Sequence, residues 1–145
     1  MFSEKNAAAG VTFPKGFKAA GVKAGIKKSG NLDLALIYTE KEAAVAGVFT
    51  KNAVAAAPVI VSREVVKGGK AHAIVANAGC ANACTGETGL ANARKMAALA
   101  AAQVGCAPEE VLVGSTGIIG VNLPMDKLEA GIKAAAAELS EDGSK

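Results

Sequence analysis

The sequence predicts a mixed α/β fold, in which helices pack on one sheet with antiparallel and parallel strands. Short apolar runs dominate the first half of the chain, and strands then alternate with helices. The chain is 51% hydrophobic but only 3% aromatic, and it lacks Trp, so Ala, Val, Leu and Ile must build the core. Such small residues let backbones pack closely, as in layered α/β folds. At 145 residues, the chain suits a single domain spanning residues 1–145.

Seven short apolar runs bounded by turn residues predict strands. They occupy residues 11–17, 20–26, 32–38, 43–49, 58–62, 71–76 and 111–113. Pro14 breaks the first run, which makes it an edge strand. The third and fourth runs are predicted to pair as a hairpin through the polar connection at residues 39–42.

Three stretches predict helices, at residues 63–67, 90–104 and 124–139. Ser62 is placed to cap the first helix at its N-terminus, and two glycines after residue 67 end it. Pro124 suits the first turn of the last helix. That helix carries an apolar stripe formed by Leu128, Ile132, Ala135 and Leu139. Residues 140–145 are predicted to be a flexible tail.

The composition excludes several classes of protein. The net charge is only +3, and no aromatic platform accompanies the scattered lysines, so nucleic-acid binding is not expected. No apolar run reaches the roughly 18 residues of a membrane span, and residues 1–5 do not resemble a secretion signal. The default expectation is therefore a cytoplasmic protein. Three cysteines and one histidine supply too few well-spaced ligands for a metal site.

The most informative stretch is Val113 to Gly120, where a short predicted strand enters a turn that is rich in glycine and hydroxyl groups. Gly117 has no Cβ, so its N–H can approach a ligand closely, and Thr116 adds a hydroxyl donor beside it. Two donors aimed at one point stabilise an oxyanion. An obvious nucleophile–base pair is lacking, so we expect the attacking residue elsewhere. The glycine spacing does not match a dinucleotide loop, and the chain has no Gly-Lys-Ser/Thr sequence.

A second unusual stretch, residues 77–86, contains two asparagines and two cysteines after a predicted strand. The asparagines are suited either to hold a ligand or to tie down the loop backbone. Cys80 or Cys84, near a helix N-terminus, is a candidate nucleophile. Its base would have to be His72, which lies at the opposite end of the predicted strand. The alternative is that the cysteines are small buried hydrophobic residues.

Taken together, the motifs resemble the N-terminal, or α, part of the ornithine acetyltransferase family, the bifunctional arginine-biosynthesis enzymes. Four motifs occur in the family's order, at residues 45–52, 56–59, 76–86 and 115–120, and the segment 10–17 also resembles the family. The resemblance covers residues 9 to 139, and its specificity comes from the combination of the motifs.

The resemblance implies an αβ sandwich of the self-processing aminopeptidase type, completed by a second (β) chain. Members are made as precursors that cut themselves, and the new N-terminal Thr of the β chain takes the acetyl group from N2-acetylornithine and passes it to glutamate. Thr116 and Gly117 match the family's oxyanion-hole pair, and Thr116 would thereby also contact the substrate. We also expect the pair to assist the self-cleavage. No resident cofactor is implied, although some members accept acetyl-CoA as a substrate.

The nucleophilic Thr and further substrate-binding residues of the family belong to motifs downstream of this sequence. We therefore expect the α part to continue through another strand, and we expect this chain to be inactive alone and to expose an apolar sheet surface. The αβ units are expected to assemble as α2β2 or larger. Three alternatives stay open: a self-processing amide hydrolase of the same fold, a non-catalytic small-ligand or subunit module, and a cysteine acyltransferase.

Overall fold

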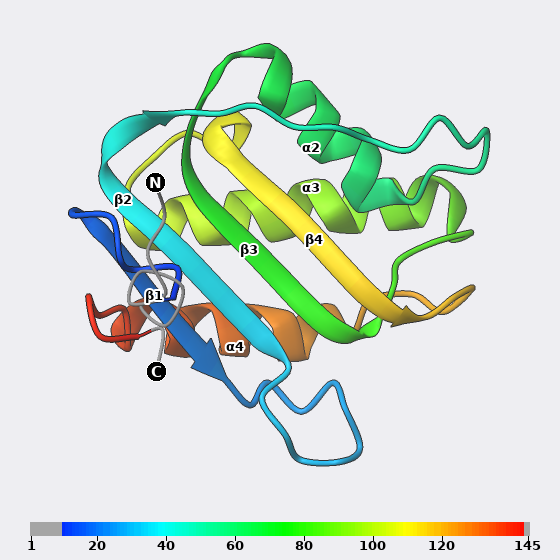
Figure 1. Cartoon of the computed structure of the whole chain (residues 1–145). Helices are drawn as coiled ribbons and strands as arrows, with labels where there is room; N and C mark the ends of the chain where they lie inside the picture. Colours follow the sequence, from blue (N-terminus) through cyan, green and yellow to red (C-terminus); the bar gives the residue numbers. More distant parts are fainter. Residues whose placement is uncertain (1–9, 144–145) are drawn as a thin grey trace.

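The computed structural model describes residues 10–143, and within them four strands form one sheet in the order β1-β2-β3-β4 (Figure 1). The strands are β1 (Phe17–Val22), β2 (Leu34–Ala44), β3 (Lys70–Cys80) and β4 (Val111–Ile118). The pairs β1–β2 and β2–β3 are antiparallel, whereas β3 and β4 are parallel. The expected mixed α/β architecture is confirmed, because a parallel pair needs a crossover and α3 supplies it.

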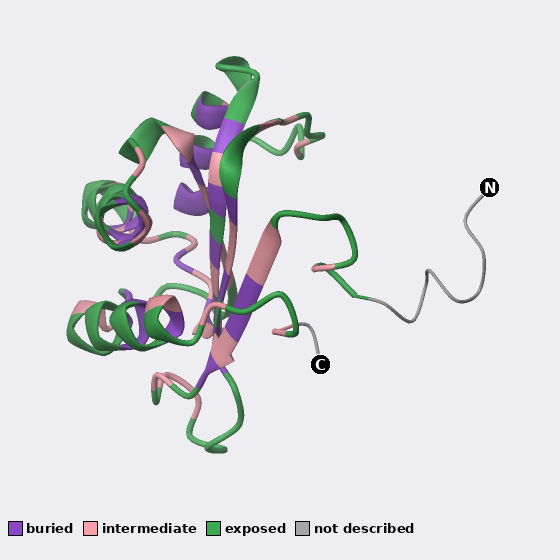
Figure 2. Ribbon diagram, turned by 90° about the vertical axis from the view of Figure 1, so that its left-hand side faces the viewer, coloured by how far each residue is buried: buried purple, intermediate pink, exposed green. Residues whose placement is uncertain are grey.

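Within residues 10–143, the long helices all cover one face of the sheet, and no described helix covers the opposite face (Figure 2). They are α2 (Ala57–Lys67), α3 (Gly86–Val104) and α4 (Met125–Ala137). Helices α2 and α3 pack against β4 and β3, and α4 packs against β1 and β2. The core therefore lies on a single side of the sheet.

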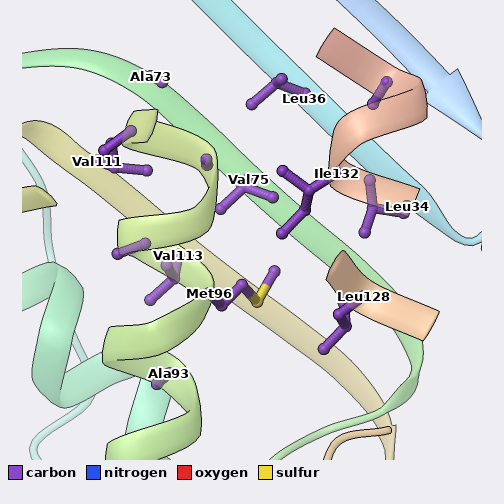
Figure 3. Packing of buried hydrophobic residues seen from close by; sticks show 14 of the residues in the cluster. Leu34, Leu36, Ala73, Val75, Ala93, Met96, Val111, Val113, Leu128 and Ile132 are labelled. Atoms are coloured by element: carbon purple, nitrogen blue, oxygen red, sulfur yellow. The ribbon is translucent and has the colours of Figure 1, made fainter. Parts of the chain in front are cut away.

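The core is built almost entirely from aliphatic side chains and alanine, as the composition predicts (Figure 3). Alternate residues of each strand, such as Leu34 and Leu36 in β2, point towards the helices and are buried. Met96 of α3 and Ile132 of α4 are fully or almost fully buried between the helices and the sheet. The predicted stripe on the last helix is confirmed for Leu128, Ile132 and Ala135, which are buried, whereas Leu139 is partly buried beyond the end of the helix at Ala137.

The strand boundaries predicted for the first 50 residues are largely wrong. Residues 11–16 form turns, and β1 begins only at Phe17 and ends at Val22 rather than at residue 26. The expected hairpin does not form: residues 34–44 are one continuous strand, β2, with an irregularity in its pairing between Tyr38 and Ala43, and residues 45–49 of the predicted second strand are not in a strand. The connection at 39–42 contains no Gly, Asn or Pro to support a turn, so the chain stays extended.

Residues 58–62, predicted as a strand, belong to helix α2. Valine and isoleucine favour strands locally, but the buried positions Ala57, Val61 and Val65 recur at helical spacing and pack on the sheet. Ser62 therefore lies inside the helix and does not cap it. The helix predicted at 90–104 is confirmed, and it begins earlier, at Gly86.

The C-terminal segment is joined to the sheet at one point. Ser140 and Ala19 exchange two backbone hydrogen bonds, with the N···O distances 2.9 Å and 3.2 Å, as an isolated antiparallel bridge beside β1. The sequence pattern did not predict this bridge in residues 140–145, of which 144 and 145 lie outside the described residues.

Candidate active site

Thr116 and Gly117 lie near the end of β4, not in a turn as the sequence suggested. The strand does not stop at Val113, because the next residues remain extended and pair with β3 up to Ile118. Both Thr116 and Gly117 are solvent-exposed. Strand β4 is an edge of the sheet, and no further described strand pairs with its outer side. The two residues are therefore accessible from outside this chain.

The Thr116 side chain lies on the face of the sheet away from the helices. It borders a shallow hollow of about 330 Å³ whose floor includes Gly21, Ala35, Ala76 and Ala78. These floor residues come from three strands and carry no side chain larger than a methyl group. The Thr116 hydroxyl consequently stands beside an open, largely apolar space.

The backbone of β4 alternates between the neighbouring strand and the free edge. Ile118 directs its carbonyl towards the β3 side, where it accepts a hydrogen bond from the Ala81 N–H at 2.9 Å. Val113 directs both its N–H and its carbonyl to the outer edge, where they bond the Ser62 hydroxyl. Gly117 is four residues after Val113 and has the same parity. Its positive φ of +130°, however, departs from regular strand geometry, and its backbone lies exposed near the end of this edge strand.

Gly117 and Gly79 are register partners across β4 and β3, and both have positive φ, +130° and +112°. A Cβ at residue 117 would collide with the Gly79 carbonyl carbon and would lie 2.6 Å from the Cys80 nitrogen. Such contact with backbone cannot be relieved by a rotamer change. Glycine is therefore required at position 117 both for its backbone angle and for the close approach of β3.

The loop that precedes β2 is organised by Asp33, a residue that the sequence analysis did not single out. Its buried carboxylate accepts hydrogen bonds from the N–H groups of Ala24 and Ile26 at 2.6 Å and Lys27 at 2.8 Å. Burial by itself raises the pKa of the carboxyl, but these donors favour its charged form, and the pKa lies below its ordinary value. The Asp33 carbonyl also accepts the Ala78 N–H. The position of Asp33, directly before an apolar strand, was the sequence signal by which this residue could have been selected.

Asn77 and Ser115 lie opposite each other just before the candidate site. The Asn77 amide donates to the Cys80 carbonyl at 2.9 Å and so holds the end of β3. Its own oxygen and the Ser115 hydroxyl oxygen are buried without a hydrogen-bond partner among the described residues. Residues 77–80 thus belong to a strand, where the sequence analysis expected a loop or a helix entry.

The remaining polar groups of the 77–86 stretch tie down the backbone. Fully buried Asn82 donates from its amide to the Gly89 carbonyl, and its oxygen accepts from the Thr85 hydroxyl. This supports the structural interpretation of Asn82. The residue also has a positive φ of 49°, which asparagine tolerates better than most residues.

The structure does not bring a cysteine and the histidine together as a nucleophile–base pair. The Cys80 thiol is buried and donates to the Val121 carbonyl, and the exposed Cys84 lies in the loop after β3. His72 lies near the start of β3, where its ring nitrogen Nδ1 bonds the Thr39 carbonyl. The cysteine hypothesis therefore has no geometrical support in these residues.

Residues 10–143 contain no group of three or more His, Cys, Asp or Glu side chains that could hold a metal ion. None of the helices in this part of the chain has the length and apolar character needed to cross a bilayer.

Comparison with known proteins identifies relatives over most of the chain. The model of the ArgJ family matches residues 18–145. The "Arginine biosynthesis bifunctional protein ArgJ" of Caldanaerobacter subterraneus subsp. tengcongensis is 55% identical over 133 residues, 92% of this chain and 33% of the relative. The protein of the same name from Streptomyces coelicolor is 54% identical, over 92% of this chain and 35% of its own length.

Two crystal structures share the fold. Ornithine acetyltransferase from Mycobacterium tuberculosis, complexed with ornithine, has a TM-score of 0.89 and 46% identity, covering 93% of this chain and 76% of that chain. The ArgJ protein of Bacillus halodurans has a TM-score of 0.85 and 40% identity, covering 93% and 71%. The chain thus spans about a third of the length of the curated relatives, but most of each crystallised chain. It belongs to the ArgJ family.

Proposed function

We propose that this chain is one part of a two-chain acetyltransferase that moves the acetyl group of N2-acetylornithine to glutamate in arginine biosynthesis. In this proposal, the chain supplies the oxyanion hole through the Thr116 hydroxyl and the Gly117 N–H. The observation that carries it is that Thr116 and Gly117 are adjacent, solvent-exposed residues near the end of β4, an edge strand of the described sheet. The chain's family includes a protein crystallised as ornithine acetyltransferase with ornithine.

The chemistry requires a nucleophile from the second chain. Its N-terminal Thr hydroxyl would attack the acetyl carbonyl carbon, and the carbonyl oxygen would become an oxyanion between the Thr116 and Gly117 donors. Collapse would break the C–N bond, release ornithine with the proton on its amine, and leave the acetyl group on the Thr. Attack by the glutamate amine through a second oxyanion would then form N-acetylglutamate and free the Thr. No resident cofactor is needed, and acetyl-CoA would enter only as an alternative acetyl donor.

The lengths of the relatives support a precursor that is cut into two chains. Nearly the same stretch fills 76% of the crystallised Mycobacterium tuberculosis chain but only 33% of the curated Caldanaerobacter sequence. By this ratio, the crystallised chain is less than half as long as the curated sequence. Cleavage of a longer precursor produces such a difference, and the remaining part would be the β chain.

The exposed face of the sheet is suited to receive that second chain. Ile37, Ile74 and Leu112 form an apolar row across β2, β3 and β4 on this face, and Ile74 is 41% exposed. Thr116 lies on the same face, so a chain that covers it would also approach the proposed donors. We propose assembly into α2β2 or a larger oligomer and a cytoplasmic location, in keeping with a biosynthetic enzyme.

The test uses protein expressed from the full precursor gene that contains this chain. Intact-mass analysis with N-terminal sequencing should find a second chain that begins with Thr. Acetyl transfer from N2-acetylornithine to glutamate should fall about 100-fold in Thr116→Val, which keeps the side-chain shape but loses the hydroxyl. Thr116→Ser, which keeps the hydroxyl, is the matched control and should retain most activity.

The outcomes separate the two parts of the proposal. A single uncut chain without transfer activity would rule out the two-chain acetyltransferase. A cut, active enzyme whose Thr116→Val variant transfers acetyl at the normal rate would remove Thr116 from the oxyanion hole. If Thr116→Val is cut normally but transfers acetyl poorly, the hydroxyl acts in transfer and not in self-cleavage.

A further inference from the structure

We infer that Asp33 is a positioning residue for the Gly117 N–H, acting through the 24–27 loop and Gly79. The inference rests on the proposed function, because it concerns the same oxyanion donor. Asp33 itself lies before β2, two strands away from Gly117 in the sheet. Its effect must therefore pass through groups that are in contact with one another.

The first contact joins the two glycines. The space where a Gly117 side chain would begin is occupied by the backbone of Gly79 and Cys80. Any shift of the Gly79 peptide towards β4 therefore displaces Gly117, because backbone atoms cannot yield by changing rotamer. A shift of the Gly79 peptide away from β4 removes the packing contact that fixes the position of Gly117.

The second contact joins Gly79 to the loop. A Cβ built on Gly79 would lie 3.0 Å from Ile26 Cγ2, 3.2 Å from Lys27 Cγ and 3.3 Å from the Lys27 nitrogen. Gly79 is thus packed between the 24–27 loop on one side and Gly117 on the other. The loop backbone sets how far Gly79 can move away from β4.

The third contact holds the loop in place. Three loop N–H groups donate to the two carboxylate oxygens of Asp33, which is only 3% exposed. The Asp33 carbonyl accepts the Ala78 N–H at 2.8 Å, so the same residue also fixes the β3 backbone one position before Gly79. Asp33 therefore sets the distance between the loop and the strand end. An oxyanion donor must be held to within about 0.5 Å of its productive position. Added mobility of the loop, Gly79 and Gly117 would therefore lower the rate of catalysis.

The principal test is Asp33→Asn in the enzyme produced from its full precursor. Asparagine has the same shape, but it replaces an acceptor oxygen with an NH2 group that cannot accept a loop N–H. We expect kcat to fall about 10- to 100-fold with KM for both substrates within about twofold, because donor placement acts on the transition state. Glu40→Gln is the matched control, since Glu40 is an exposed carboxylate of β2 paired with Lys18. It should behave as the wild type.

A spectroscopic measurement tests the inference independently of activity. In an NMR experiment, Thr is labelled with 13C at its carbonyl and Gly with 15N at its amide, so that only glycines that follow a Thr give a signal. In this chain these are Gly86, Gly89 and Gly117. Asp33→Asn should move the Gly117 signal and leave the other two in place as internal references. If the wild-type enzyme does not transfer acetyl, the proposed function fails, and the Gly117 signal still decides whether Asp33 positions this group.

A second variant covers the case in which Asp33→Asn does not fold. Ile26→Ala keeps the carboxylate and its three donors but removes the methyl group, Cγ2, that lies 3.0 Å from the position of a Cβ on Gly79. It should move the Gly117 signal in the same way and lower kcat by a smaller factor. A folded Asp33→Asn enzyme with normal kcat and an unmoved Gly117 signal overturns the inference. If only Ile26→Ala folds, the same two normal results overturn it.

Discussion

Ser62 and Val113 are joined by two hydrogen bonds through a single hydroxyl group. The Ser62 hydroxyl donates to the Val113 carbonyl at 2.7 Å and accepts from the Val113 N–H at 2.9 Å. Helix α2 thereby satisfies both backbone groups that Val113 directs to the outer edge of β4. Further along β4, Thr116, Gly117 and Ile118 are exposed to solvent.

Ser62→Ala should destabilise the chain by about 1–3 kcal/mol. The serine is buried, and its loss leaves a backbone donor and acceptor of Val113 without a partner. Chemical denaturation followed by circular dichroism measures the change. Ser29→Ala, which alters an exposed loop hydroxyl, is the control and should change stability by less than about 0.5 kcal/mol. Equal stability of both variants would show that water replaces the lost bonds at no cost.

Gly117→Ala should destabilise the fold by about 2 kcal/mol or more. The new Cβ would collide with the Gly79 backbone, and the positive φ of 130° disfavours any residue other than glycine. Gly114→Ala in the same strand is the matched control, because its Cβ would lie at an ordinary 3.5 Å from the Ala76 Cβ. Thermal unfolding of the two variants distinguishes them. A Gly117→Ala protein as stable as Gly114→Ala would contradict the close contact of the two strands.

Acid should weaken the loop at residues 24–27 through protonation of Asp33. The carboxyl is buried, which raises its pKa, but the three N–H donors outweigh this effect, and the folded-state pKa is lowered. Because the folded-state pKa is lowered, the ionised carboxylate stabilises the folded protein at pH values above the unfolded-state pKa of about 3.9. This stabilisation is lost as the pH falls through the folded-state pKa. Stability measured from pH 7 to pH 2 should therefore show the loss only below about pH 4.

The comparison with Asp33→Asn isolates this contribution. At pH 7 the variant should be less stable by about 2 kcal/mol, since it loses hydrogen bonds to a charged group. The difference between the two proteins should shrink as the pH falls below about 4, because the protonated aspartic acid resembles asparagine. A difference that stays constant down to pH 2 would mean that Asp33 ionisation does not support the loop.

Ile74→Asp should prevent assembly with the proposed second chain. Ile74 lies in the middle of the exposed apolar row, so a carboxylate there would be buried without a partner if another chain covers the face. The side chain is exposed in this chain, which should itself still fold. Co-purification of the two chains is the measurement. Ala102→Asp, at an exposed position of helix α3, is the control and should leave assembly intact.

The sequence determined the fold class, the last two long helices and the central strand of this protein. These elements were predictable because their signals are local and agree with burial: an apolar stripe on the helix at Met125–Ala137, and a buried run in β3. The candidate donors Thr116 and Gly117 could also be selected from sequence, because glycine beside a hydroxyl residue is a chemical signal that needs no coordinates. Their proposed role came from resemblance to a family.

The tertiary structure decided what local signals could not express. Residues 58–62 prefer strands by composition but form a helix, since packing of Val61 on the sheet outweighs β-branched propensity. Residues 39–42 look like a connection but continue β2, and the strand pairs with β3 on both sides of them, at Tyr38 and at Ala43. The contact between Gly79 and Gly117, and the hold of Asp33 on the loop beside them, join segments far apart in sequence. No periodicity encodes such contacts, because they exist only once the strands are aligned.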